Sequence, residues 1–248
     1  MVPGMGGCHG AQEATELMRT LGIVGGIGPE STIEYYRTII GLCREKNGPE
    51  NYPPIIINSI NVAKMLGMIQ RGQLAETADY ILDAVRSVAR AGADLGLIAS
   101  NTPHIVFDDI AERSPIPLIS IVGATCDAAK AMGLGTFALL GTRTAMQGGF
   151  YQKHFAALGM AIVLPSERDQ TVVHDRYMTE LVQGVFREET RAELLSIVDK
   201  LIAEHSVEAV ILGGTELPLL FRASTHGSVP LLDTTHIHAE RAVSEMIR

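Results

Sequence analysis

The segments IASNTPH, residues 98–104, and ILGGTELP, residues 211–218, each end a run of apolar residues with a polar stretch, and they resemble each other. Two further matching stretches follow them, IPLISIVGATCDAA from residue 116 and VPLLDTTHIHAERA from residue 229. Self-similarity of this kind is typical of a chain built from related structural units. The repeat therefore predicts two similar lobes, with the ligand bound where they meet.

The spacing of the repeat supports the same division. Gly25 ends the apolar run LGIVG 75 positions before Ser100, and Gly141 ends the run FALLG 73 positions before Gly214. The two halves thus match in spacing as well as in pattern. We expect Ser100 and Gly214 to occupy equivalent places at strand ends in the two lobes.

Apolar runs alternate with segments of helical periodicity along the chain. Apolar side chains recur at helical spacing in residues 74–91 and again in residues 190–205. Parallel strands need crossover connections of about a dozen residues or more, so this alternation predicts an α/β fold with parallel sheets. The expected strands are residues 20–25, 55–60, 94–99, 116–120, 136–141, 160–164, 208–213 and 229–233.

Polar residues follow several of these apolar runs. In open α/β sheets the ligand lies beyond the carboxyl ends of the strands, so these residues form the candidate site. They are Gly25 to Ser31, Asn58 to Asn61, Ser100 to His104, Thr142 to Thr144, and Thr215 with Glu216.

The composition of the 248 residues argues against several classes of function. The net charge is -8 and none of the 20 Lys and Arg residues form a run, so we expect no nucleic-acid partner. No stretch approaches about 18 uninterrupted apolar residues, so we expect no membrane partner. Three scattered cysteines without a Cys-x-x-Cys pair fit a reducing cytoplasm. The Gly-rich residues 1–19 are expected to form a loose leader.

The turn GGIGPEST, residues 25–32, lacks the third glycine of a dinucleotide fingerprint. Pro29, which has no main-chain N–H to donate, stands where the following helix should begin. We therefore expect no nicotinamide or flavin cofactor. Glycines such as Gly26 instead let the backbone approach a small ligand, and N–H groups at a helix start can bind a carboxylate. A purely structural turn is the alternative.

Five motifs together resemble the cofactor-independent aspartate/glutamate racemase superfamily, nearest its aspartate racemase branch. They are GIVGGIGPEST, SNTPH, LLGTRTAMQGGFY, LGGTELPLL and PLLDTTHIHA, and the likeness runs from about Thr20 to the C-terminus. The resemblance implies two Rossmann-like lobes with parallel sheets, related by a pseudo-twofold axis, with the active site in the cleft between them. It also implies a homodimer. We assign residues 20–118 with 229–248 to the N-terminal lobe and residues 119–228 to the C-terminal lobe.

The resemblance further implies a pair of catalytic cysteines that this chain lacks. Racemases of the family hold the substrate α-carbon between two thiols, one from each lobe; the first precedes Asn-Thr and the second precedes Thr-Glu. Here Ser100 precedes Asn101, and Gly214 precedes Thr215. A serine hydroxyl needs an adjacent base, and glycine offers no group at all. Two-thiol racemisation is therefore not supported by this sequence.

The remaining polar residues match positions where the family grips the carboxylate and amino groups of its substrate. Hydroxyl, amide and backbone donors that converge on one anion can bind it without Lys or Arg. An arginine for a distal carboxylate is not evident after the second strand, and Arg143 or Gln147 could replace it. The expected substrate-binding residues are Gly26, Ser31, Thr32, Asn58, Asn101, Thr102, Thr142, Thr144, Gly214 and Thr215.

The catalytic candidates are Ser100, Glu216 and His104, because each carries a group suited to acid–base work or to nucleophilic attack. Glu216 follows Gly214 at a strand end, where the absent thiol is expected to leave space beside it. The alternative for Glu216 is a carboxylate that holds the substrate ammonium, and His104 could face either the pocket or the lobe surface. The motif HIH, residues 236–238, lacks further recognisable ligands, so we expect no metal.

Three classes of function fit these residues. The first is a racemase or epimerase that acts on a small amino acid or carboxylate with a single base and an unconventional partner. The second is a lyase or hydrolase of a small carboxylate, and the third is a non-catalytic carboxylate-binding protein. We favour the first, which predicts that Ser100 and Glu216 line the cleft between the lobes.

Overall fold

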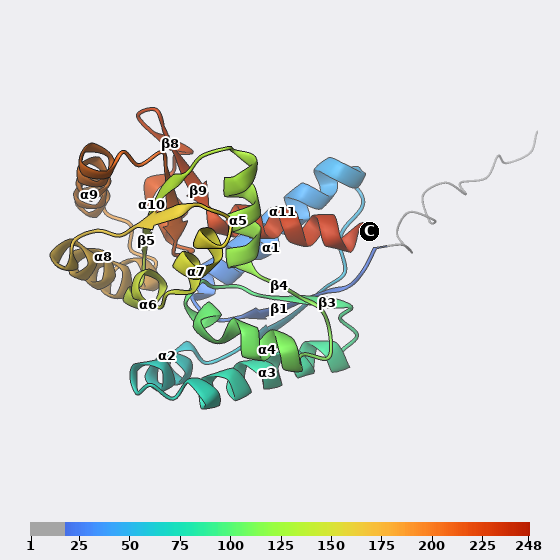
Figure 1. Ribbon diagram of the computed structural model, residues 1–248. Helices are drawn as coiled ribbons and strands as arrows, with labels where there is room; N and C mark the ends of the chain where they lie inside the picture. The colour runs from blue at the N-terminus through green and yellow to red at the C-terminus, as the bar shows by residue number, and fades with distance from the viewer. Residues whose placement is uncertain (1–17) are drawn as a thin grey trace, which may run out of the picture.

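The computed structural model describes residues 18–248, which form two lobes, each with its own sheet (Figure 1). The expected leader lies outside the described residues except at its end. There Arg19 is held to the fold, because its N–H donates to Met246 O at 2.9 Å and its guanidinium donates to Asp94 O at 3.0 Å. Within the described residues, none of the helices is long and apolar enough to cross a membrane.

The N-terminal sheet has four parallel strands in the order β2-β1-β3-β4, and helices cover both of its faces. The strands are β1 (Leu21–Gly25), β2 (Ile55–Ser59), β3 (Leu95–Ile98) and β4 (Leu118–Ile119). One face packs against α2 (Val62–Gln70), α3 (Leu74–Arg90) and α4 (Phe107–Arg113), and the other against α1 (Pro29–Asn47) and α11 (Thr234–Met246). The 3-10 helix η1 (Thr102–Val106) follows β3.

The C-terminal sheet repeats this plan with the order β6-β5-β7-β9-β8, in which only β8 is antiparallel. Its strands are β5 (Thr136–Gly141), β6 (Ala161–Val163), β7 (Ala209–Gly213), β8 (Thr225–His226) and β9 (Val229–Asp233). One face packs against α5 (Ile121–Ala131) and α7 (Phe150–Ala156). The other packs against α6 (Arg143–Gln147), α8 (Glu167–Thr179), α9 (Glu188–His205) and α10 (Leu217–Phe221), and η2 (Leu181–Gln183) follows α8.

The two lobes exchange a helix in each direction. After β4 the chain leaves the N-terminal sheet, and α5 packs its buried residues on the C-terminal sheet. After β9 the chain leaves the C-terminal sheet, and α11 returns to the N-terminal sheet, as the red helix of Figure 1 shows. We expected residues 229–248 to belong to the N-terminal lobe. This assignment is wrong for β9, which pairs with β7 in the C-terminal sheet, because only α11 packs on the N-terminal lobe.

Two buried histidines hold the chain where it first crosses between the lobes. His104 Nε2 accepts a hydrogen bond from Ile121 N at 3.1 Å, and His238 Nε2 donates to Ile119 O at 2.9 Å. The second ring nitrogen of His238 accepts from the hydroxyl of Tyr35 at 2.8 Å. Both rings therefore bond to the main chain on either side of residue 120, which fixes the point at which α5 departs.

Burial lowers the pKa of both histidines, to about 3 for His104 and to about 4 for His238, from the usual value of 6.5. At pH values between the folded and the unfolded pKa, each of these histidines binds a proton in the unfolded chain but not in the folded protein. We therefore predict that the free energy of unfolding falls as the pH is lowered from about 6.5 to about 4, by up to about 1.4 kcal/mol per pH unit for each ring.

Urea denaturation between pH 4 and pH 8 measures this dependence. The variant His238→Gln should have a shallower slope than the wild type. Equal slopes in the two proteins would contradict the assignment.

Candidate functional site

The carboxyl ends of the two sheets meet around a small inner cavity between the lobes. Its volume is about 30 Å³, which is about enough for one water molecule. Apolar side chains form much of the wall, and five polar side chains line it from the two lobes. It is lined by Ile27, Gly28, Val62, Leu66, Ser100 and Thr102 from the N-terminal lobe and by Thr142, Tyr177, Met178, Val182 and Glu216 from the C-terminal lobe.

A wider outer cleft of about 690 Å³ continues from this cavity. The two spaces share a boundary formed by Leu66, Met178, Thr102 and Thr142. The outer cleft has the volume typical of a site for a small ligand, and the inner cavity does not. A substrate would therefore occupy the outer cleft and reach the inner cavity only after boundary side chains move.

Glu216 forms the C-terminal-lobe wall of the inner cavity. It lies after β7 at the start of α10, and only 2% of it is exposed. Its carboxylate accepts hydrogen bonds from Thr215 Oγ1, at 3.0 Å, and from the hydroxyl of Tyr177. Burial raises the pKa of Glu216, although the hydrogen bonds from these two hydroxyls lower it in part.

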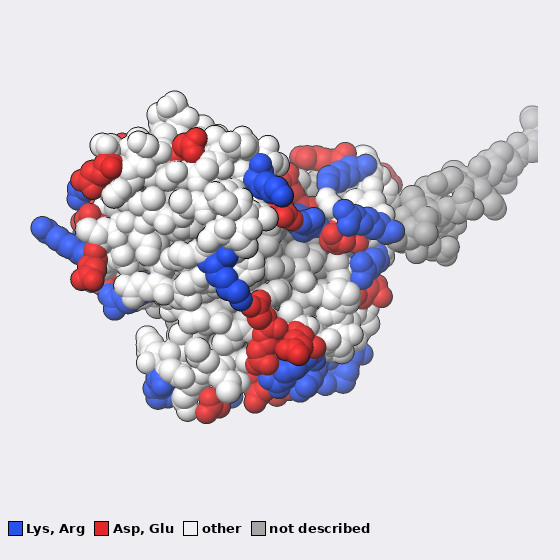
Figure 2. Space-filling view, in the orientation of Figure 1, with Lys and Arg blue, Asp and Glu red and all other residues white. Residues whose placement is uncertain are grey.

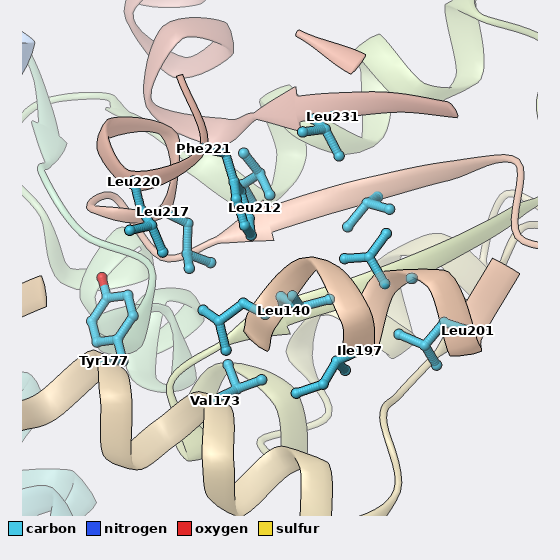
Figure 3. Close-up of a cluster of buried hydrophobic side chains, with 14 of the residues drawn as sticks. Leu140, Val173, Tyr177, Ile197, Leu201, Leu212, Leu217, Leu220, Phe221 and Leu231 are labelled. Carbon is cyan, nitrogen blue, oxygen red and sulfur yellow. The ribbon is translucent and has the colours of Figure 1, made fainter. Parts of the chain in front are cut away.

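Tyr177 comes from α8 and was not among the candidates that the sequence suggested. It lies at the margin of the buried cluster in Figure 3, and its hydroxyl points away from Val173. Burial and the charge of Glu216 raise the pKa of this phenol well above its usual value. The phenol therefore donates to the carboxylate of Glu216 and stays protonated.

Ser100 faces the same cavity from the N-terminal lobe. It follows β3, is 7% exposed, and accepts a hydrogen bond from His104 Nδ1 through its main-chain oxygen at 2.9 Å. The structure thus brings Ser100 and Glu216 to one cavity, in the place where the repeat predicts equivalent strand ends.

His104, the third catalytic candidate, is not among the residues that line the inner cavity. Because Nε2 accepts from Ile121 N, Nδ1 carries the proton and donates it to Ser100 O. Both ring nitrogens are therefore occupied by the main chain, and the ring stacks on Phe107 with 4.7 Å between centroids. Spacing alone could not distinguish this arrangement from a catalytic Ser-His pair.

Several expected substrate-binding residues instead hold the lobes together. Asn101 accepts from the hydroxyl of Tyr151 at 2.6 Å and donates to Thr234 Oγ1 at 3.1 Å. Thr102 and Thr142, from opposite lobes, share a hydrogen bond of 2.9 Å, yet they also line the cavity. The pair therefore connects the lobes at the boundary between cavity and cleft.

Other expected substrate-binding residues are bonded within the N-terminal lobe. Ser31 Oγ donates to Ala99 O at 3.3 Å, and Asn58 Nδ2 donates to Ala84 O at 3.3 Å. Thr32 Oγ1 accepts from Gly26 N at 2.9 Å, which closes the turn that precedes α1. Three of the expected substrate-binding residues do line the cavity or the cleft, Thr102, Thr142 and Thr144, as do the catalytic candidates Ser100 and Glu216.

No group of three or more His, Cys, Asp or Glu side chains placed to hold a metal ion occurs in the described part of the chain. The side chains that line the cavity and the cleft offer hydroxyl groups, the carboxylate of Glu216 and the guanidinium group of Arg143.

Comparisons of this chain with known proteins agree on one protein family. The family model for Asp/Glu/Hydantoin racemase matches residues 24–242. The chain belongs to this family. It is 23% identical to the broad specificity amino-acid racemase RacX of Bacillus subtilis (strain 168) over 233 residues, covering 90% of this chain and 96% of that protein.

Solved structures support the family's fold and the aspartate racemase branch. A crystal structure of an Asp/Glu racemase candidate from Yersinia pestis is 32% identical, with a TM-score of 0.83, and the match covers 93% of this chain and 100% of that one. An aspartate racemase homologue from Pyrococcus horikoshii OT3 is also 32% identical over the same shares, with a TM-score of 0.78.

In this Asp/Glu/Hydantoin racemase family member, the space beside Gly214 is filled. A Cβ atom built on Gly214 would lie 2.9 Å from the hydroxyl oxygen of Tyr177 and closer still to its ring edge. The ring thus occupies the space of any side chain at position 214. The expectation that the absent thiol leaves space beside Glu216 is wrong, because Tyr177 fills it.

We predict that Gly214→Ala lowers the free energy of unfolding by about 1–3 kcal/mol, because the added methyl group overlaps the ring. In a Tyr177→Leu background, which lacks the outer ring atoms, the same change should cost less. Urea denaturation of the four proteins of this double-mutant cycle measures the coupling.

Gly41→Ala serves as the control for that cycle. A Cβ there would meet no atom within 4 Å, and Gly41 lies inside α1, where alanine is the better helix former. An equal cost of Gly214→Ala in both backgrounds would show that Tyr177 does not fill the space beside Gly214.

Proposed function

We propose that this protein transfers a proton at the α-carbon of a small amino acid or related carboxylate, without a cofactor, in the cleft between the lobes. The observation that carries the proposal is that Ser100, from the N-terminal lobe, and Glu216, from the C-terminal lobe, line one inner cavity. The family relationship supports an amino-acid racemase-like activity, since the relatives include a broad specificity amino-acid racemase.

Glu216 is the proposed base. A carboxylate is a useful general base when its pKa lies closer to neutral pH than usual, and burial raises the pKa of Glu216 in that direction. Its hydrogen bonds from Thr215 and Tyr177 hold the carboxylate in one orientation. A fixed orientation favours proton transfer to a substrate atom at a defined position.

Among the described residues that line the inner cavity, the N-terminal lobe contributes only the hydroxyls of Ser100 and Thr102 as polar side-chain groups. Ser100 can donate a hydrogen bond to the substrate, but the imidazole of its neighbour His104 is bonded to the main chain and cannot activate it. Proton removal and return are therefore efficient on the wall of Glu216 alone. We propose that exchange of the α-proton with solvent is faster than inversion of the α-carbon.

The outer cleft accounts for binding of the rest of the substrate. Arg143, Thr144 and Gln147 line it, and the cationic side chain of Arg143 suits an anionic group at the far end of a small substrate. The hydroxyl groups of Ser100, Thr102 and Thr142 would bind the α-carboxylate of the substrate near the boundary between the inner cavity and the outer cleft. A homodimeric, cytoplasmic enzyme is part of the same proposal.

A lyase or hydrolase that needs one base is the second candidate. The observation that favours it is the placement of the titratable group, Glu216, on a single wall, since elimination or decarboxylation needs no second base. The third candidate, a carboxylate-binding protein without activity, predicts binding to the cleft and no chemistry.

Proton NMR in deuterated water, with a panel of amino acids and small dicarboxylates, tests the proposal. We predict loss of the α-proton signal with wild-type protein and a rate lower by a factor on the order of 10²–10⁴ with Glu216→Gln. The control Glu240→Gln, which changes an exposed carboxylate on α11, should match the wild type.

Other results of the same experiment contradict the proposal in distinct ways. New products without α-exchange would establish the lyase or hydrolase. Broadening of ligand signals with neither exchange nor products would establish the binding protein.

A further inference from the structure

We propose that Tyr177 is a catalytic residue, and that its phenol takes the place of the C-terminal-lobe thiol and relays the substrate α-proton to Glu216. The inference rests on the proposed function, because it names the group that touches the α-proton in the same cavity. It is carried by the positions of Tyr177, Gly214 and Glu216.

The first step of the argument is position. The hydroxyl oxygen of Tyr177 lies 2.9 Å from the point where a side chain at position 214 would begin. The resemblance to the family places a thiol on that side chain, aimed at the substrate α-carbon. Tyr177 also lines the inner cavity together with Ser100. The phenol oxygen thus lies close to the start of that side chain, and Tyr177 lines the same cavity.

The second step is the carboxylate beside the phenol. Tyr177 donates its hydroxyl hydrogen to Glu216 Oε2, and Thr215 Oγ1 donates to the same oxygen at 3.0 Å. On its other side the carboxylate rests against Gly28, where a Cβ atom would overlap Oε1 and where φ is +83°. Glycine at 28 and glycine at 214 therefore leave room for the carboxylate and the phenol respectively.

The third step is the chemistry that this pair can perform. The substrate Cα–H bond breaks as an O–H bond forms at Tyr177, while the phenol's own proton moves to Glu216. The electron pair of the broken bond remains on the α-carbon and is delocalised into the substrate carboxylate. Return of both protons by the reverse path restores the phenol and the carboxylate, so no further reactant is needed.

The direction of the pKa shifts agrees with a concerted relay. Burial raises the pKa of Tyr177 well above its usual value, so a free phenolate would be costly. Burial also raises the pKa of Glu216, which makes this carboxylate a stronger proton acceptor. The proton of Tyr177 therefore moves to Glu216 as the substrate proton arrives.

A second buried tyrosine provides the comparison. Tyr35 donates its hydroxyl to His238 in the packing between α1 and α11, and it is absent from the residues that line the inner cavity. Tyr35→Phe therefore removes a buried hydroxyl of the same kind without changing the cavity. It is the matched control for Tyr177→Phe.

The test is the α-proton exchange rate of wild type, Tyr177→Phe and Tyr35→Phe with the best substrate of the panel. We expect Tyr177→Phe to lower the rate on the order of 10²–10⁴-fold, with substrate affinity changed by less than about tenfold. Any residual activity should have an acid limb at higher pH, since the hydrogen bond from Tyr177 lowers the pKa of Glu216. Tyr35→Phe should exchange at the wild-type rate.

Exchange by Tyr177→Phe within threefold of the wild-type rate would overturn this inference and leave the proposed function standing. Absence of exchange in the wild type itself would overturn both. If Tyr177→Phe fails to fold, a fluorinated tyrosine at position 177 replaces it, because fluorine lowers the phenol pKa and keeps the hydroxyl. An altered pH–rate profile would then support the relay, and an unchanged profile would overturn it.

Discussion

The reciprocal crossing of α5 and α11 is the constraint on which the rest of this structure depends. Each helix follows a strand of one lobe and packs on the sheet of the other, so neither apolar core is complete without both lobes. The crossing holds the carboxyl ends of the two sheets against each other. Ser100 and Glu216 face one cavity for that reason, although their positions lie far apart in the sequence.

Hydrogen bonds between polar side chains also join the two lobes at the centre of the molecule. Asn101, Tyr151 and Thr234 form one connected set of hydrogen bonds across the lobes, and Thr102 with Thr142 forms another. Buried polar groups are costly when unpaired, so such sets favour one relative orientation of the lobes. On the face seen in Figure 2, basic side chains lie beside acidic ones. One exposed ion pair, between Lys153 Nζ and Asp108 Oδ2 at 3.1 Å, also joins the two lobes.

The strands and long helices could be predicted from the sequence because their apolar runs have clear periodicity. The structure confirms the eight expected strands and the helices of residues 74–91 and 190–205, each within a few residues. Strand β8 was not predicted, since two residues carry no periodicity. The assignment of residues 229–248 to one lobe failed because sequence order does not reveal that a strand and the following helix pack on different sheets.

The site could be predicted only in part. Residues that follow strands, such as Ser100 and Glu216, were found because topology dictates where strand ends gather. Tyr177 was missed because it lies inside a helix and reaches the site from the side. The available signal was Gly214, at a position where the resemblance implies a cysteine. In a closely packed interior, a missing side chain indicates that a neighbouring side chain fills its space.

The claim at the centre of this account is that proton transfer occurs on one wall of the cavity only, the wall of Glu216 and Tyr177. The most direct measurement compares two rates for a single enantiomer of the substrate in deuterated water: deuterium incorporation by NMR and inversion by chiral chromatography. The account predicts incorporation at least tenfold faster than inversion, with retained configuration, because Ser100 lacks a base. Equal rates from the start of the reaction would contradict it, since they require an effective acid on the opposite wall.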